Sequence, residues 1–173
     1  EAIWNKNANS QSTELAIDAI CLILNNINSF KNNYRDVLIR KKMMIASNKA
    51  GLAFSNTKTA AAHSISYPLT IDFGIPHGIA SSISLIPLLK INNYSIKKPL
   101  SEIFNRLDTD FDTLLNQINL IPEGIVPFKL SKWKIKKTDL IPLSEKSFTK
   151  GRMDNNIVDL NRNEVLRLLE EIF

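Results

Sequence analysis

Apolar residues recur at intervals of three and four positions over most of this chain, and this spacing limits the folds that the chain can adopt. Leu15, Ala19 and Leu22, with Ala16 and Ile20 beside them, show the pattern clearly. No stretch alternates apolar and polar residues for long enough to predict a sheet, and no internal repeat is evident. We therefore predict an all-α fold.

Local start and stop signals set the approximate limits of the predicted helices. Asn161, with Glu164 three residues later, resembles the capping box of a last helix. Pro68 has no backbone N–H, so the helix that carries His63 must stop or bend there. His77 then lies at the N-terminus of the next helix. The predicted helices cover residues 13–33, 34–53, 60–68, 78–89, 100–107, 111–118 and 161–172.

Gly51 lies inside the second predicted helix, where glycine costs about 1 kcal/mol relative to alanine. Small residues around it, Ala46, Ala50 and Ala53, would allow another helix to approach closely. We expect close packing or a nearby ligand to be the reason for this glycine.

Size and composition predict one folded domain over residues 1–173, because 44% of the residues are apolar. No apolar run approaches the roughly 18 residues that span a bilayer, and residues 1–5 lack the order of a signal peptide. We expect a soluble, cytoplasmic protein with no membrane contact. Cys21 is the only cysteine, which excludes a disulfide framework and a zinc cluster of thiolates.

The net charge of +5 is modest, and its densest basic stretch lies within residues 129–152. Such a run can contact phosphates, but few aromatic side chains that could stack on bases are interleaved with it. We interpret it as solvated surface and disfavour nucleic acid as a partner. The alternative, a non-catalytic basic helical module that binds nucleic acid or an acidic protein partner, stays open at this point.

The only two histidines, His63 and His77, lie fourteen residues apart around a bend marked by Gly74 and Pro76. Neutral imidazole is a good ligand for Zn²⁺ or Fe²⁺, and a helix followed by a tight bend can bring two imidazoles to one ion. Metal sites need three or four ligands, and Asp72 is the only carboxylate between the histidines. Spacing alone therefore leaves two interpretations, a metal site and a pair of core or helix-capping histidines.

Two segments resemble the signature of the iron-containing (group III) alcohol dehydrogenases. They are Ala-Gly-Leu-Ala-Phe-Ser-Asn at residues 50–56, followed after six residues by His63, and Ile-Pro-His-Gly-Ile-Ala at residues 75–80. The similarity is strong over residues 46–87 and looser over the whole chain. Residues 152–156 are similar to the Asn-Asn segment before the last helix of that family.

This resemblance implies that the chain is the C-terminal helical domain of a two-domain enzyme, a multi-helix bundle that holds the metal. The N-terminal α/β nucleotide-binding domain is absent from this chain and would be its partner. His63 and His77 match two of the four metal ligands of the family, and the other two, an Asp and a His, would lie shortly before Glu1. We therefore expect the isolated chain to be inactive, to expose an apolar face and to form a homo-oligomer.

The resemblance also implies the chemistry, which is hydride transfer between a nicotinamide cofactor and a primary alcohol or aldehyde. The expected cofactors are a divalent metal, Fe²⁺ in first place and Zn²⁺ in second, together with NAD or NADP in the intact enzyme. Phe54 matches an aromatic residue that lines the substrate pocket of the family, although an ordinary core phenylalanine is the alternative.

Tyr67 departs from the family, many members of which have a histidine at this position. Its hydroxyl can donate or accept a hydrogen bond or relay a proton, so it is the candidate catalytic residue, but it is a poorer base than imidazole at neutral pH. The pattern His-x-x-Ser-Tyr-x-Leu at residues 63–69 looks more like members that handle polar or anionic aldehydes.

Overall fold

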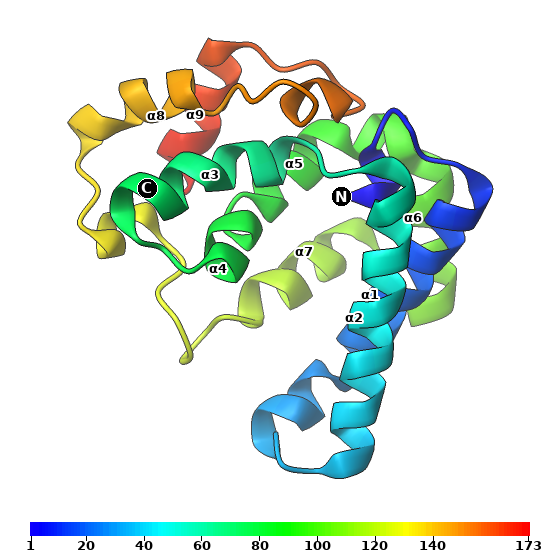
Figure 1. Cartoon of the computed structure of the whole chain (residues 1–173). Coiled ribbons are helices and arrows are strands. Elements are labelled where there is room, and N and C mark those ends of the chain that lie inside the picture. Colours follow the sequence, from blue (N-terminus) through cyan, green and yellow to red (C-terminus); the bar gives the residue numbers. More distant parts are fainter. The chain divides into compact units, whose positions relative to one another are not determined.

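The computed structural model describes residues 1–173 and contains nine α-helices, five 3₁₀ helices and no β-strand, so the all-α prediction is confirmed (Figure 1). Its contacts divide the chain into two compact units. Unit 1 comprises Glu1, Thr59–Ser95 and Pro122–Phe173, and unit 2 comprises Ala2–Lys58 and Ile96–Ile121. The single folding domain expected from the sequence stays a prediction. None of the helices combines the length and the apolar character needed to cross a membrane.

Unit 2 is built around a hairpin of two long helices whose first residues are capped by side chains. Asn9 accepts a hydrogen bond from the Ser12 amide, and Ser12 Oγ accepts one from the Asn9 amide, both at 2.9 Å. Asp36 Oδ1 accepts from the Leu38 amide at 2.8 Å, so the second helix begins three residues later than predicted. The helices of unit 2 are η1 (Ala2–Trp4), α1 (Ser10–Asn32), α2 (Val37–Thr57), α6 (Lys97–Leu107) and α7 (Phe111–Leu120).

The outer face of α2 is apolar and exposed. Val37, Leu38 and Met44 are 77%, 72% and 69% exposed. A shallow groove of about 470 Å³ on this helix is lined by Val37, Met44 and Ile45 together with the polar residues Arg40, Lys41 and Asn48. This face agrees with the expected exposed apolar surface, while its occupant, a second copy or the nucleotide-binding domain, stays a prediction.

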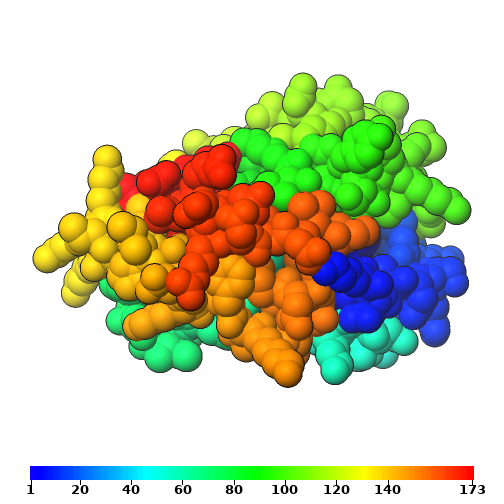
Figure 2. All heavy atoms as spheres, turned by 90° about the horizontal axis from the view of Figure 1, so that it is seen from above, coloured from blue at the N-terminus to red at the C-terminus, as the bar shows by residue number.

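Unit 1 carries both histidines and is built from shorter helices. The predicted helix at residues 78–89 is interrupted at Ile83 and Ser84, and the short helix over residues 140–146 was not predicted. Helices α8 and α9 pack against each other, and their gold to red atoms lie together on the face shown in Figure 2. The α-helices of unit 1 are α3 (Ala61–Phe73), α4 (His77–Ser82), α5 (Leu85–Asn92), α8 (Leu140–Lys146) and α9 (Arg162–Glu171). Its 3₁₀ helices are η3 (Leu130–Trp133), η4 (Lys137–Asp139) and η5 (Met153–Asn155), and η2 (Asn93–Ile96) leads into unit 2.

Helix α3 does not stop at Pro68 but continues through it to Phe73. Proline inside a helix costs about 3 kcal/mol, because it removes one hydrogen bond and crowds the preceding turn. On either side of it, Ile65 and Leu69 are fully buried, and each contributes roughly 1.5–3 kcal/mol through burial. Packing of this face therefore offsets the cost of the proline, and the helix ends at the left-handed Gly74 instead.

Gly51 should be replaceable by alanine with a gain in stability. A Cβ atom built at this position meets no atom of the chain within 4 Å, so the expected close packing is wrong, while the alternative of a nearby ligand stays a prediction. Within the chain, only the entropic cost of glycine remains. We expect Gly51→Ala to raise the free energy of unfolding by about 1 kcal/mol, measured by urea denaturation. Ala50→Gly, one residue earlier in the same helix, is the matched control and should lower it by a similar amount. A destabilised Gly51→Ala would contradict the absence of steric constraint.

Candidate metal centre

A tight reversal between α3 and α4 places the two histidines at neighbouring helix ends. Gly74 adopts φ 66°, and its N–H donates to the Thr70 carbonyl at 3.1 Å. This single bond across four residues is the αL pattern of a glycine-terminated helix, and the Ile75 N–H donates to the Leu69 carbonyl at 3.3 Å. Helix α4 begins at His77, as the sequence predicts. The chain thus turns back on itself within the few residues that separate the two helices.

The two imidazole rings meet in an edge-to-face arrangement. Their centres are 5.2 Å apart, and their planes meet at 61°. A ring nitrogen binds an ion such as Zn²⁺ at about 2.0–2.1 Å, so two rings that share a tetrahedral ion have their centres roughly 5 Å apart. The separation of the His63 and His77 rings is compatible with a shared divalent ion, and their role as metal ligands stays a prediction. His77 is exposed, and 26% of the His63 side chain is exposed, so the pair is accessible to further ligands.

The chain contributes no complete metal site of its own. No group of three or more His, Cys, Asp or Glu side chains is arranged to hold a metal. Asp72, the carboxylate between the histidines in the sequence, accepts a hydrogen bond from Lys146 Nζ at 2.6 Å. A complete site would require ligands in addition to these two imidazoles.

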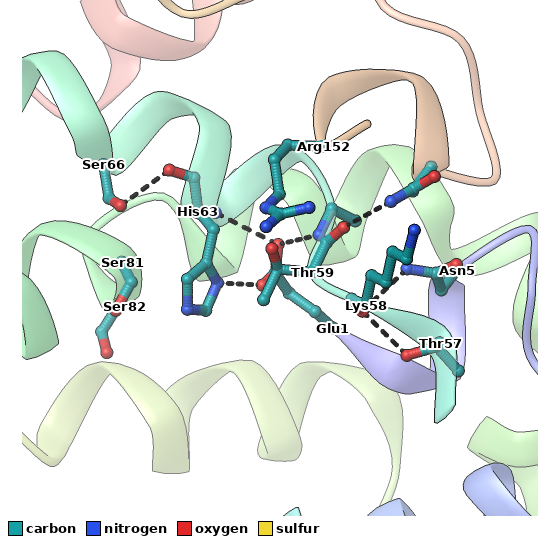
Figure 3. Close-up of polar contacts among 12 residues, drawn as sticks. Glu1, Asn5, Thr57, Lys58, Thr59, His63, Ser66, Ser81, Ser82 and Arg152 are labelled. Atoms are coloured by element: carbon teal, nitrogen blue, oxygen red, sulfur yellow. Dashed lines mark hydrogen bonds and ion pairs between the residues drawn. The ribbon is translucent and has the colours of Figure 1, made fainter. Parts of the chain in front are cut away.

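Glu1 contacts His63 twice, although sequence reasoning gave it no role (Figure 3). Its Oε2 pairs with Nδ1 of the His63 ring, and its Oε1 accepts from the backbone amides of Ala60 and His63, each at 3.2 Å. Burial raises the pKa of the Glu1 carboxyl, and the hydrogen bonds that this group accepts from the ring and the backbone of His63 lower it.

Tyr67 lies one helical turn after His63 on α3 and is half-buried. Its hydroxyl accepts a hydrogen bond from Arg152 Nε at 3.1 Å, and Arg152 Nη1 donates to the Gly151 carbonyl at 2.7 Å. Arg152 forms no ion pair with a carboxylate of unit 1. A half-buried guanidinium with unused donors thus lies beside Tyr67, the candidate catalytic residue. No signal in the sequence indicated this contact, because Arg152 and Tyr67 are 85 positions apart.

Segment 147–156, which carries Arg152, is tied to α3 and α5 by buried polar side chains. Ser64 Oγ donates to the Ser147 carbonyl at 2.5 Å and accepts from the Thr149 amide at 3.0 Å. Asn155 Nδ2 donates to the Thr59 carbonyl at 2.9 Å. The side chains of Asn156 and Asn92 donate to each other at 2.9 and 3.2 Å, and both are fully buried. The Asn-Asn segment therefore has a structural role in this chain.

Two further features predicted from the sequence are Phe54 and the basic stretch within residues 129–152. Phe54 is 45% exposed on α2 in unit 2, so it is not an ordinary core residue, and its place in a substrate pocket stays a prediction. Within the basic stretch, Lys146 pairs with Asp72, and Lys129 Nζ donates to the Glu171 carbonyl at 3.1 Å.

Comparisons with known proteins give the family and the fold of the chain. The sequence model of the Fe-containing alcohol dehydrogenase family, C-terminal, matches residues 1–173. An NADPH-dependent butanol dehydrogenase of Clostridium saccharobutylicum is 30% identical over 92% of this chain and 44% of its own length. A sulfoacetaldehyde reductase of Bilophila wadsworthia is 28% identical over the same two shares. The crystal structure of a 1,3-propanediol oxidoreductase shares the fold, with a TM-score of 0.91 and 23% identity over 100% of this chain and 48% of that protein. The chain thus spans about half the length of these proteins.

Ser64→Ala should destabilise unit 1, because the Ser147 carbonyl and the Thr149 amide would both lose a buried partner. We expect the free energy of unfolding to fall by about 1–3 kcal/mol in urea denaturation. Ser55→Ala is the matched control, since the Ser55 hydroxyl is exposed and donates only to the Leu52 carbonyl of its own helix. Its effect should stay within about 0.5 kcal/mol. Equal effects of the two substitutions would show that the Ser64 hydrogen bonds do not stabilise the segment.

Proposed function

We propose that this chain is the metal-binding half of an NAD(P)-dependent alcohol dehydrogenase or aldehyde reductase. The chain belongs to the iron-containing alcohol dehydrogenase family, because residues 1–173 match the C-terminal part of that family throughout. The observation that carries the proposal is the 5.2 Å separation of the His63 and His77 rings, which suits a shared ion. The nucleotide-binding domain and the remaining metal ligands would belong to a part of the protein that precedes Glu1. The expected metal is Fe²⁺ first and Zn²⁺ second, and the nicotinamide cofactor is NAD or NADP.

His63 and His77 hold the divalent ion in this proposal, each through a neutral ring nitrogen. When bound, the ion supplies Lewis-acid polarisation of the alcohol or carbonyl oxygen, and the nicotinamide supplies or accepts the hydride. Tyr67 lies one turn further along α3 and presents a hydroxyl that already accepts a hydrogen bond from Arg152. Its own proton remains available for the substrate oxygen, and we assign it the role of hydrogen-bond donor and proton relay.

We assign a polar or anionic aldehyde as the substrate class, on two grounds. The pattern at residues 63–69 first suggests it, and Arg152 adds a physical reason. A guanidinium with unused donors binds carboxylate, sulfonate or phosphonate groups through paired hydrogen bonds. The similarity to a sulfoacetaldehyde reductase supports the same class of substrate.

The alternative of a nucleic-acid-binding module has no specific support in the structure. Two lysines of the basic stretch are engaged within unit 1, Lys146 with the Asp72 carboxylate and Lys129 with a helix-terminal carbonyl. A phosphate-binding surface would require several basic side chains directed to a common face, together with aromatic groups for stacking.

Replacing either histidine tests the metal assignment. In the full-length protein, His63→Ala and His77→Ala should each remove bound metal, measured by elemental analysis, and lower kcat/KM by at least about 100-fold, because the ion stabilises charge on the reacting oxygen. Asp72→Asn is the control and should retain both metal and activity, since Asp72 pairs with Lys146. Full metal content in both histidine variants would contradict the proposal. The chain of residues 1–173 by itself should bind metal weakly and show no NAD(P)-dependent turnover.

Replacing Arg152 tests the substrate class. Arg152→Gln should lower kcat/KM for sulfoacetaldehyde by about 10- to 100-fold, since a hydrogen bond to a charged group contributes roughly 1.5–3 kcal/mol. The effect on butanal, a neutral aldehyde, should be several-fold at most. Lys150→Gln is the matched control, because it removes a neighbouring exposed positive charge. Equal losses for both aldehydes would show that Arg152 acts through Tyr67 and does not select anions.

A further inference from the structure

The Glu1 carboxylate is used entirely by the first turn of α3. Only 9% of its side chain is exposed. Oε1 accepts from the amides of Ala60 and His63, and Oε2 meets Nδ1 of the same His63 (Figure 3). One carboxylate thus contacts both the backbone and the ring of a single histidine, which holds the side chain at two points.

These contacts determine which nitrogen of His63 carries the proton. Backbone amides can only donate, so Oε1 must accept, and an ionised carboxylate is an acceptor at both oxygens. Nδ1 is therefore the protonated nitrogen of the neutral ring, and Nε2 keeps its lone pair. Metal-binding histidines generally donate their other ring N–H to a carboxylate, carbonyl or water in this way, which fixes the tautomer and raises the basicity of the ligating nitrogen.

We infer that Glu1 is a positioning residue that fixes the His63 ring and its tautomer, so that Nε2 is the atom presented to a divalent ion. The part of the inference that concerns the ion rests on the proposed function. The part that concerns the tautomer stands on the contacts of the metal-free chain alone. Nothing else in unit 1 gives His63 Nδ1 an acceptor, since Glu1 is the only partner of that nitrogen.

A purely structural role for Glu1 makes a different prediction. Ala60, which precedes the first residue of α3, makes no side-chain cap, so Glu1 also caps this helix through two backbone amides. Loss of a cap lowers stability by about 0.5–2 kcal/mol but leaves the ring tautomer unchanged. The test must therefore read the ring itself.

Glu1→Gln in the full-length protein separates these roles. The amide oxygen of glutamine can accept from the two backbone amides, but its NH₂ group then faces Nδ1 and favours the tautomer with the proton on Nε2. We would record ¹⁵N–¹H correlations of the histidine rings in the metal-free protein at mildly alkaline pH, and identify His63 by the loss of its signals in His63→Ala. Affinity for Co²⁺ would be measured by titration of its visible absorption.

The wild type should show protonated Nδ1 and unprotonated Nε2, and Glu1→Gln should invert or mix the tautomers and weaken Co²⁺ binding by about 10- to 100-fold. Glu164→Gln is the matched control, because Glu164 also accepts from a backbone amide at a helix start but touches no histidine. It should change neither readout. Unprotonated Nδ1 in the wild type, or Co²⁺ affinity of Glu1→Gln within twofold of the wild type, would overturn the inference. Failure of the wild type to bind Co²⁺ would overturn the proposed function and leave the tautomer result to decide the role of Glu1.

Discussion

The backbone of Gly74 sets the distance between the two histidines, because its left-handed conformation ends α3 and allows α4 to begin three residues later. Any residue with a Cβ atom is strained at φ 66°, and a helix that continued past Phe73 would carry His77 away from His63. The 5.2 Å separation of the rings is thus a property of the turn, and the chemistry proposed for the chain depends on it.

Hydrogen bonds of polar groups hold the segment that carries Arg152. Arg152 belongs to segment 147–156, in which Met153 is the only buried apolar residue, so few apolar contacts hold the segment. Ser64, Asn155 and Asn156 replace those contacts by binding backbone or amide groups far away in the sequence. A buried polar group that loses its hydrogen-bond partner costs free energy, and it finds that partner in only one arrangement of the chain. These hydrogen bonds therefore select one position for the segment. The contact between Arg152 and Tyr67 follows from that selection.

The sequence predicts helices well where their signals are local. The capping box of Asn161 and Glu164 is present, and α6 and α7 are separated at residues 108–110 as expected. Pro68 was misleading because a local rule cannot weigh the burial of Ile65 and Leu69 against one lost hydrogen bond. The spacing of the two histidines around Gly74 indicated that they could lie close together, although spacing alone did not decide between a metal site and a pair of core histidines. The contact of Glu1 was not predictable, since Glu1 reaches His63 across 62 positions and no periodicity records such a contact.

Tyr67 and Arg152 together give position 67 a different charge and basicity from those that a histidine would give. A neutral imidazole can accept a proton near neutral pH, whereas a phenol cannot, so this chain has less base strength at that point. In return, the Arg152 guanidinium adds a permanent positive charge beside the Tyr67 hydroxyl. In a partly buried site such a charge stabilises an anionic group more strongly than it would in water. The same charge favours the hydroxyl as a donor to developing negative charge on a substrate oxygen. An anionic aldehyde would gain from both effects, and a neutral one only from the second.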